Sequence, residues 1–253
     1  MDRTGATESS RLPQSCALCG GIGDLRRSHI IPEFLHRPIY DTDHSTQVIA
    51  YGATRARTLR KGLRERLLCD ACEARMKVYE DYFVQAWRDN PALNAELPGD
   101  FTLTGLDYAK TKLFMLSILW RASVSVLPDF SAVKLGPHEE RIRKMLLASD
   151  AGCPEDYRVI AGLIWDPVTK RRWDNILMPP LYLRVNGGAA YRMVLGGASW
   201  TVIVSKHTNL SFDPRWLTID GQLHLTCCSW SRFSGLSGAT EALSRLPDDD
   251  PRP

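Results

Sequence analysis

Hydrophobic positions recur along the chain with a helical period in one part and a strand period in another. In residues 73–88, Tyr79, Phe83 and Trp87 recur every four positions among strong helix formers. This spacing places them on one face of an α-helix. Proline cannot continue a helix through its missing N–H, so Pro91 predicts the end of this one.

Two further helices and a sheet are expected after this point. Residues 107–127 are apolar almost all round, which is typical of a central buried helix. Residues 138–148 have the spacing of an amphipathic packing helix. From residue 157 to residue 230, β-type segments alternate with turns that contain Gly, Pro or Asn, which predicts a mostly antiparallel sheet. We therefore expect an α+β fold.

Changes in composition predict how the chain is organised. The polar residues 1–14 and the acidic, proline-containing tail at 245–253 offer no hydrophobic face and are expected to be disordered. Between them we expect an N-terminal module at 15–90 and an α+β domain at 100–240, with helices at 107–150 and the sheet at 157–230.

Overall composition is that of an ordinary globular protein. Of 253 residues, 44% are hydrophobic and 24% are charged, which suffices for a sizeable core. The N-terminus lacks an apolar signal region, and no run of apolar residues is long enough to cross a bilayer. We therefore expect a soluble, cytoplasmic protein with no membrane partner. The net charge of +3 does not by itself imply nucleic-acid binding.

Four of the seven cysteines form two CxxC pairs, Cys16 with Cys19 and Cys69 with Cys72. Each pair is expected to form a tight turn whose two thiolates span one edge of a tetrahedron, so the two pairs together predict one structural zinc ion. In a chain of this length, such pairs indicate a metal site in a reducing compartment rather than a disulfide framework. The other three cysteines are expected to be small buried side chains: Cys153, Cys227 and Cys228.

A histidine motif lies between the two cysteine pairs. The relevant segments are Cys16-Ala17-Leu18-Cys19, Ser28-His29-Ile30-Ile31-Pro32 and Leu67-Leu68-Cys69-Asp70-Ala71-Cys72-Glu73. Over residues 16–85 this order resembles the HNH endonuclease family in its zinc-stapled form. The resemblance implies a ββα-metal module and a nuclease that hydrolyses phosphodiester bonds in DNA. It also implies that His29, at a strand end, is the general base and that Mg²⁺ or Mn²⁺ stabilises the leaving oxygen.

This chain departs from the family pattern at three places. Ser28 stands where the family has a metal ligand, Glu73 stands where it often has His or Asn, and no asparagine precedes the second cysteine pair. Carboxylates suit Mg²⁺, so Glu73, with Glu80 on the same helix face, could serve as the catalytic-metal ligands. Alternatively, Glu73 stabilises the helix N-terminus, Glu80 is a solvated charge, and His29 only hydrogen-bonds the cysteine turn.

Positive charge is concentrated just before the second cysteine pair. Residues 55–66 contain six Lys or Arg residues and one acid, Glu65. If the module binds DNA, this stretch and two arginines near the first pair are expected to contact phosphates. These residues are Arg26, Arg27, Arg55, Arg57, Arg60, Lys61, Arg64 and Arg66. The alternative is a flexible, solvated insert.

Two functions from different classes fit these features. The first is a metal-dependent HNH-type nuclease with His29 as its base. The second is a non-catalytic, zinc-stapled nucleic-acid-binding or effector module, regulated by a C-terminal domain that binds a small ligand or a protein. The remaining histidines are expected to be ordinary, with His36 the one of most interest because it follows His29 by seven positions.

Overall fold

A computed structural model describes residues 14–40, 42–43, 45–48, 57–60, 62–94, 99–166, 170–174, 176–205 and 215–229. The predicted disordered N-terminus, apart from Gln14, and the predicted acidic tail lie outside these residues. In the described part of the chain, no helix is both long enough and apolar enough to cross a membrane.

The N-terminal half consists of short elements that lead into one long helix. They are β1 (Gln14–Ser15), β2 (Ile22–Gly23), β3 (Arg26–His29), α1 (Glu33–His36), the 3₁₀ turn η1 (Arg37–Ile39), β4 (Ser45–Val48), β5 (Arg57–Arg60), β6 (Arg64–Leu68), α2 (Asp70–Phe83), the π-helical turn η2 (Val84–Arg88) and α3 (Pro91–Asn94). The helix predicted at 73–88 is confirmed as α2 and η2, and it begins at Asp70, directly after Cys69.

The C-terminal half contains two more helices and the main sheet. Its elements are β7 (Phe101–Leu103), α4 (Tyr108–Val124), η3 (Pro128–Phe130), α5 (Pro137–Ala148), β8 (Arg158–Trp165), β9 (Met178–Val185), β10 (Gly188–Leu195), β11 (Ala198–Ile203) and β12 (Leu223–Ser229). The predicted helices correspond to α4 and α5, and the α+β class is confirmed. As its apolar sequence predicts, α4 is buried along most of its length.

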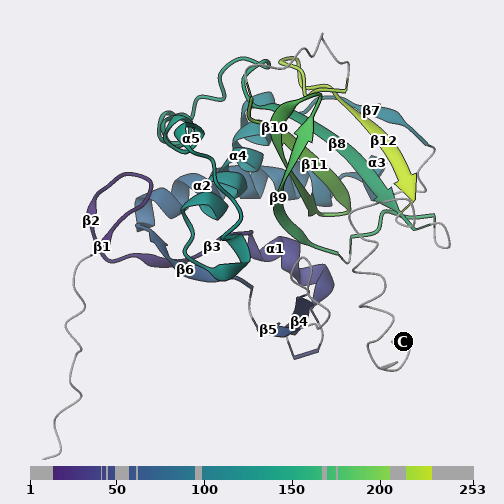
Figure 1. Ribbon diagram of the computed structural model, residues 1–253. Helices are drawn as coiled ribbons and strands as arrows, with labels where there is room; N and C mark the ends of the chain where they lie inside the picture. The colour runs from purple at the N-terminus through teal and green to yellow at the C-terminus, as the bar shows by residue number, and fades with distance from the viewer. Residues whose placement is uncertain are drawn as a thin grey trace, which may run out of the picture.

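The six strands of the main sheet follow the order β7-β12-β8-β11-β10-β9. Its pairs are antiparallel except β12 with β8, which is parallel, and β12 lies between β7 and β8. The turn between β10 and β11 is made by Gly196 and Gly197, both at positive φ, a conformation that glycine adopts without strain. Figure 1 shows α2 and α4 between this sheet and the β3–β6 pair.

Strands β3 and β6 pair antiparallel across a long insert, and α2 follows β6 directly, giving a strand-strand-helix unit. The register shifts between Arg26 and Arg27, so the pairing passes over Leu67 and forms a β-bulge. A bulge re-aims the side chains beside it, and Leu67 and Leu68 are accordingly both buried. The Leu67 carbonyl accepts a 3.0 Å hydrogen bond from the Ala17 N–H. The bulge thus connects β6 to the first cysteine pair.

An aromatic cluster joins the two halves of the chain. The Phe83 ring of α2 stacks on Phe114 of α4 with centroids 4.1 Å apart, and it meets Trp200 of β11 edge-on at 5.6 Å. Trp87 packs against Trp200 at 4.5 Å and donates its indole N–H to the Gly196 carbonyl at 2.9 Å. These side chains belong to one contiguous hydrophobic core that runs from the cysteine turns to the sheet.

We expect Phe83→Ala to lower the free energy of unfolding by about 3–5 kcal/mol, because it removes the ring at the centre of this cluster. Since the core is contiguous, the helices and the sheet are expected to unfold together in one transition with a lower urea midpoint. Unfolding of the helices and of the sheet is followed by circular dichroism and tryptophan fluorescence. The control is Val78→Ala, at a side chain of α2 that is 53% exposed, with an expected change within about 0.5 kcal/mol. Two separate transitions in the variant would contradict the shared core.

Candidate metal centre and histidine site

The first cysteine pair lies in the tight turn between β1 and β2. The Cys16 N–H donates to the Gly21 carbonyl at 2.8 Å, and the Gly20 N–H donates to the Cys16 carbonyl at 2.8 Å. Gly20 has a φ of +76°, which a residue with a side chain adopts only with strain. The Gly21 N–H approaches the Cys19 Sγ at 3.4 Å. The backbone of this turn therefore fixes the two thiols and donates to one of them.

The second cysteine pair lies at the N-terminus of α2. Cys69 is the N-cap residue and Cys72 lies in the first turn, so both thiols lie on the same side of the helix end. The Cys69 N–H donates to the Cys16 Sγ at 3.4 Å. The positive end of the helix dipole and such N–H donors both favour thiolates over thiols.

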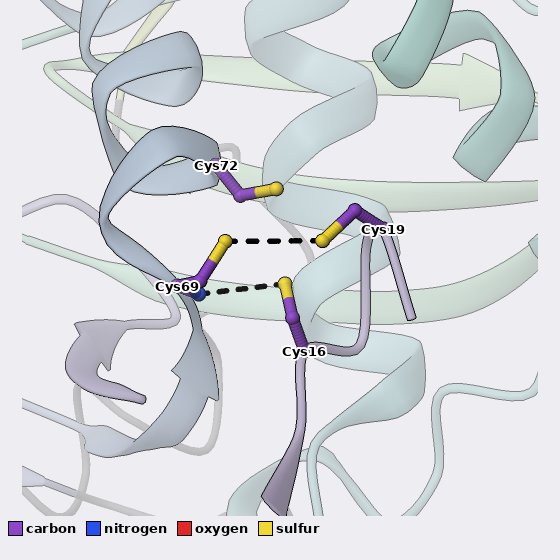
Figure 2. A group of neighbouring side chains, drawn as sticks. All are labelled: Cys16, Cys19, Cys69 and Cys72. Atoms are coloured by element: carbon purple, nitrogen blue, oxygen red, sulfur yellow. Dashed lines mark hydrogen bonds between the residues drawn. The ribbon is translucent and has the colours of Figure 1, made fainter. Parts of the chain in front are cut away.

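The four sulfur atoms converge. Every pair of their Sγ atoms lies within 4.8 Å, and Cys19 Sγ is 3.8 Å from Cys69 Sγ. Figure 2 shows the four side chains pointing toward one another. Tetrahedral zinc with bonds of about 2.3 Å needs sulfur atoms about 3.8 Å apart. The predicted cysteine set can therefore hold a metal such as zinc.

The protonation of these thiols reflects the same geometry. Burial acts to raise the pKa of Cys16, but backbone N–H groups of Cys19, Cys69 and Leu18 outweigh it and lower that pKa to about 7. Burial raises the pKa of Cys72 well above its usual range. A bound cation removes this second cost, because it stabilises each thiolate directly.

His29 is the last residue of β3, and its Nε2 lies against the Oε2 of Glu33, a contact that becomes an ion pair when the imidazole is protonated. The two side chains are 23% and 37% exposed, so solvent reaches both. The chain returns Glu33 to His29 because β3 ends at His29 and Glu33 is the first residue of α1, directly after its N-cap residue Pro32. Ile30 and Ile31 are fully buried and anchor this turn.

His36 and Gly62 lie close to His29 and Glu33. His36 is 2% exposed, and burial lowers its pKa to about 4 despite the nearby Glu33 carboxylate, so its ring is neutral at neutral pH. A β-carbon at Gly62 would lie 3.3 Å from both His29 Cδ2 and His36 Nε2. Glycine is therefore the residue that lets the backbone approach both rings.

Tyr40 completes this group of side chains. Its ring stacks on His36 with centroids 6.0 Å apart. Burial, and then the Glu33 carboxylate, raise the pKa of Tyr40 to about 12, whereas Arg64 acts to lower it. Arg64 is therefore close enough to act electrostatically on this group, and it is the cross-strand partner of His29.

One face of the β3–β6 pair carries three arginines of the predicted phosphate-binding set. Arg27 pairs with Arg66, and His29 pairs with Arg64. Cross-strand partners share a face, and so do residues two apart on a strand. Arg27, Arg64 and Arg66 therefore lie on the same face as His29.

The remaining arginines of that set have different positions. Arg26 forms an ion pair with Asp70 at the start of α2. Arg55 and Lys61 lie outside the described residues, and only the backbone of Arg57 and Arg60 is described, in β5. The clustering of basic side chains near His29 therefore rests on Arg27, Arg64 and Arg66.

The side chains expected to bind a catalytic metal do not converge. In the described part of the chain, the four cysteines are the one group of three or more His, Cys, Asp or Glu residues whose ligand atoms gather within 4.8 Å. Ser28 is buried, and its hydroxyl accepts a 3.2 Å hydrogen bond from the Leu68 N–H at the bulge. Glu80 forms a 3.0 Å ion pair with Arg121. Glu73 has one buried carboxylate oxygen with no hydrogen bond among the described residues.

Arg121 connects this site to the core. Its side chain is 1% exposed, and its Nη1 donates to the His29 carbonyl at 2.8 Å as well as pairing with Glu80. The same guanidinium donates twice to Ser117, one helical turn earlier in α4, at 3.3 Å. Burial raises the pKa of Glu80, and the Arg121 charge opposes that rise. One buried cation thus holds the end of β3 against α2 and α4.

Comparisons with protein-family models, with curated proteins and with solved structures find no match for this chain. The resemblance to HNH endonucleases therefore stays a proposal. It rests on the cysteine and histidine motifs and on the arrangement around them.

Three residues around His29 were missed by the sequence analysis: Glu33, Tyr40 and Gly62. Glu33 carried a usable signal, because it follows His29 by four positions across a proline that forces the chain to turn. Gly62 lies within the basic stretch at residues 55–66, and no role of its own was predicted for it. Its role depends on a contact with two rings that the sequence places far from it.

Purified protein is expected to carry one zinc ion per chain, measured by elemental mass spectrometry. Cys72→Ser should lose most of this zinc, because the change removes one of four converging thiolates. The control is Cys153→Ser, at a cysteine outside the cluster that donates to Asp156, and it should retain the metal. The expectation that Cys153, Cys227 and Cys228 are buried was wrong, because Cys153 is exposed and the other two are partly exposed. Zinc should be released as the pH falls, because protons compete for the thiolates. Equal zinc content in both variants would contradict the four-cysteine site.

Arg121→Met is expected to lower the free energy of unfolding by about 3–5 kcal/mol, because it leaves Glu80 partly buried without its counter-ion. Adding Glu80→Met to this variant should restore much of the loss, since no unpaired charge then remains. Urea unfolding of the two single variants and the double variant gives the coupling energy. Losses that simply add would show that the two side chains do not depend on each other.

Proposed function

We propose that this chain is an HNH-type nuclease that hydrolyses phosphodiester bonds in DNA, with His29 as the general base. The observation that carries the proposal is the position of His29. It ends β3 of a strand-strand-helix unit and shares its face with Arg27, Arg64 and Arg66. A base and several cations on one accessible face are what attack on an anionic phosphodiester requires.

The side chains on this face are proposed to have two roles, proton acceptance by His29 and phosphate binding by the arginines. An imidazole has a pKa near neutrality and can take a proton from water. Guanidinium groups stay protonated and bind phosphate oxygens with paired N–H donors. Arg64, opposite His29, is therefore proposed to hold the scissile phosphate, with Arg27 and Arg66 on neighbouring phosphates. Such contacts carry no base recognition, so cleavage without strong sequence preference is expected.

The four-cysteine centre has a structural role in this proposal. Four protein thiolates complete the coordination of zinc and leave no open position for water or substrate, which is typical of structural sites. The two cysteine turns come from the start of the module and from the β6–α2 junction. A metal there would hold β6 and α2 against the first turn and so support the strand that ends at His29.

The expected Mg²⁺ or Mn²⁺ has no preformed protein cage among the described residues. Ser28 and Glu80 are engaged elsewhere, and Glu73 is the predicted ligand whose carboxylate keeps an unsatisfied oxygen. Mg²⁺ is often bound by one or two carboxylates together with substrate phosphates. A requirement for a divalent ion is therefore tested by adding Mg²⁺, Mn²⁺ or a chelator to the cleavage reaction.

The second candidate is a zinc-stapled module that binds nucleic acid without cleaving it. The engagement of Glu80 with Arg121 favours it, because Glu80 was expected to serve a catalytic metal, and Ser28, at the family's ligand position, is engaged in a structural contact. On this reading the face with Arg27, Arg64 and Arg66 binds DNA, and the contact between His29 and Glu33 is structural.

Plasmid and single-stranded DNA cleavage with Mg²⁺, Mn²⁺ or a chelator separates these functions. His29→Ala is expected to reduce cleavage by about 10²–10⁴-fold, the usual contribution of a general base. The control is His224→Ala in β12, whose ring contacts Thr102, and it should cleave like the wild type. Zinc content is measured for each protein, so that unfolding is not mistaken for inactivity.

If the wild-type protein does not cut, its binding to the same DNA distinguishes the remaining possibilities. Wild-type protein that binds DNA in a salt-dependent way but cuts nothing would support the binding module. Replacing Arg27, Arg64 and Arg66 together with Ala should weaken binding and reduce its salt dependence. Wild-type protein that neither binds nor cuts at low salt would contradict both functions.

A further inference from the structure

We propose that Glu33 is a positioning residue for the general base: its carboxylate holds Nε2 of His29 as an N–H, so that Nδ1 is the atom that takes the proton. This inference rests on the proposed nuclease function. It concerns a residue for which the sequence analysis predicted no role.

The first support is the contact itself. Glu33 Oε2 pairs with His29 Nε2, and both side chains are partly buried. A carboxylate charge in such a setting is screened less by salt than one on the open surface. The carboxylate therefore acts on the ring directly rather than through bulk solvent.

The second support is that the backbone of both partners is fixed. Ile30 and Ile31 between them are fully buried, and the Ile30 N–H donates to the Leu63 carbonyl at 3.0 Å. Arg121 donates a hydrogen bond to the His29 carbonyl, and Pro32 restricts the backbone at the start of α1. With the main chain held at both ends, the Glu33 carboxylate orients the ring of His29.

The third support is the chemistry of a neutral imidazole, which has one N–H and one basic nitrogen. An ionised carboxylate only accepts hydrogen bonds, so it selects the form with hydrogen on Nε2 and makes Nδ1 basic. In the reaction, a water O–H bond breaks and its proton passes to Nδ1. The water oxygen bonds to phosphorus, and the leaving oxygen departs with the electron pair of its P–O bond. The imidazolium that forms is stabilised by the Glu33 charge.

The other groups that face His29 fit this assignment. His36 is buried and neutral at neutral pH, so it forms a wall of the site and is not the base. Tyr40 keeps its proton at neutral pH, because burial and Glu33 raise its pKa to about 12. Arg64 faces the site as a cation from β6. Glu33 therefore supplies negative charge next to a ring that gains positive charge.

Steady-state cleavage by Glu33→Gln tests the proposal. We expect kcat to fall by about 10²-fold or more, with a change in KM below about 3-fold, because the partner acts on the base and not on substrate binding. Glu33→Asp should recover part of the lost kcat, since it restores the charge. The control is Asp81→Asn, which removes an exposed carboxylate of α2 that pairs with Lys77, and its kcat should equal that of the wild type.

A second measurement does not depend on activity. In ¹⁵N-histidine-labelled protein, the His29 nitrogen shifts are expected to report hydrogen on Nε2 in the neutral ring, and Glu33→Ala should give a mixture of the two forms. An unchanged kcat in Glu33→Gln, or unchanged shifts in Glu33→Ala, would overturn the positioning role while the nuclease function stands. Wild-type protein that cuts no DNA would overturn the nuclease function and with it any catalytic role for Glu33, whatever the nitrogen shifts report.

Discussion

The arrangement of the candidate site depends on the hydrogen bonds and the ion pair that the buried guanidinium of Arg121 makes. Arg121 lies in the central helix α4, yet it bonds the carbonyl of His29 at the end of β3 and the carboxylate of Glu80 on α2. A charge this deeply buried is stable only when several acceptors surround it, so these three elements have little freedom to separate. The same ion pair takes Glu80 away from any metal, which links the stability of the fold to the chemistry available at the site.

The four-cysteine centre supplies a second constraint, at the opposite end of the β3–β6 pair. The bulge at Leu67 turns two adjacent leucines into the core and leaves a carbonyl for the Ala17 N–H. Ser28 accepts the N–H of Leu68 at the same point. Ser28, which stands at the position of a metal ligand in the HNH family, is thus part of the structure that brings the second cysteine pair to the first.

Between these two constraints, the exposed edge of the unit carries its reactive groups. His29 is accessible, its partner Glu33 is fixed by the turn at Pro32, and the arginine side chains come from neighbouring positions of both strands. The rest of the chain packs behind this edge through the aromatic cluster around Phe83 and Trp200. The site is therefore built on strands and helices held by one core, which is the condition for a fixed geometry of its side chains.

The sequence by itself determined the features that depend on local pattern and spacing: the helices, the mostly antiparallel sheet, the cysteine set and the position of His29 at a strand end. These follow from periodicity, from proline and from ligand spacing, all of which act over a few residues. Tertiary structure alone decided which polar groups from distant segments meet. Glu80 and Glu73 share a helix face in the sequence, but Glu80 is engaged because α4 brings Arg121 against it. Gly62 and His36 meet His29 through the fold of the insert. Contacts of this kind depend on how distant segments pack, and no local pattern encodes them.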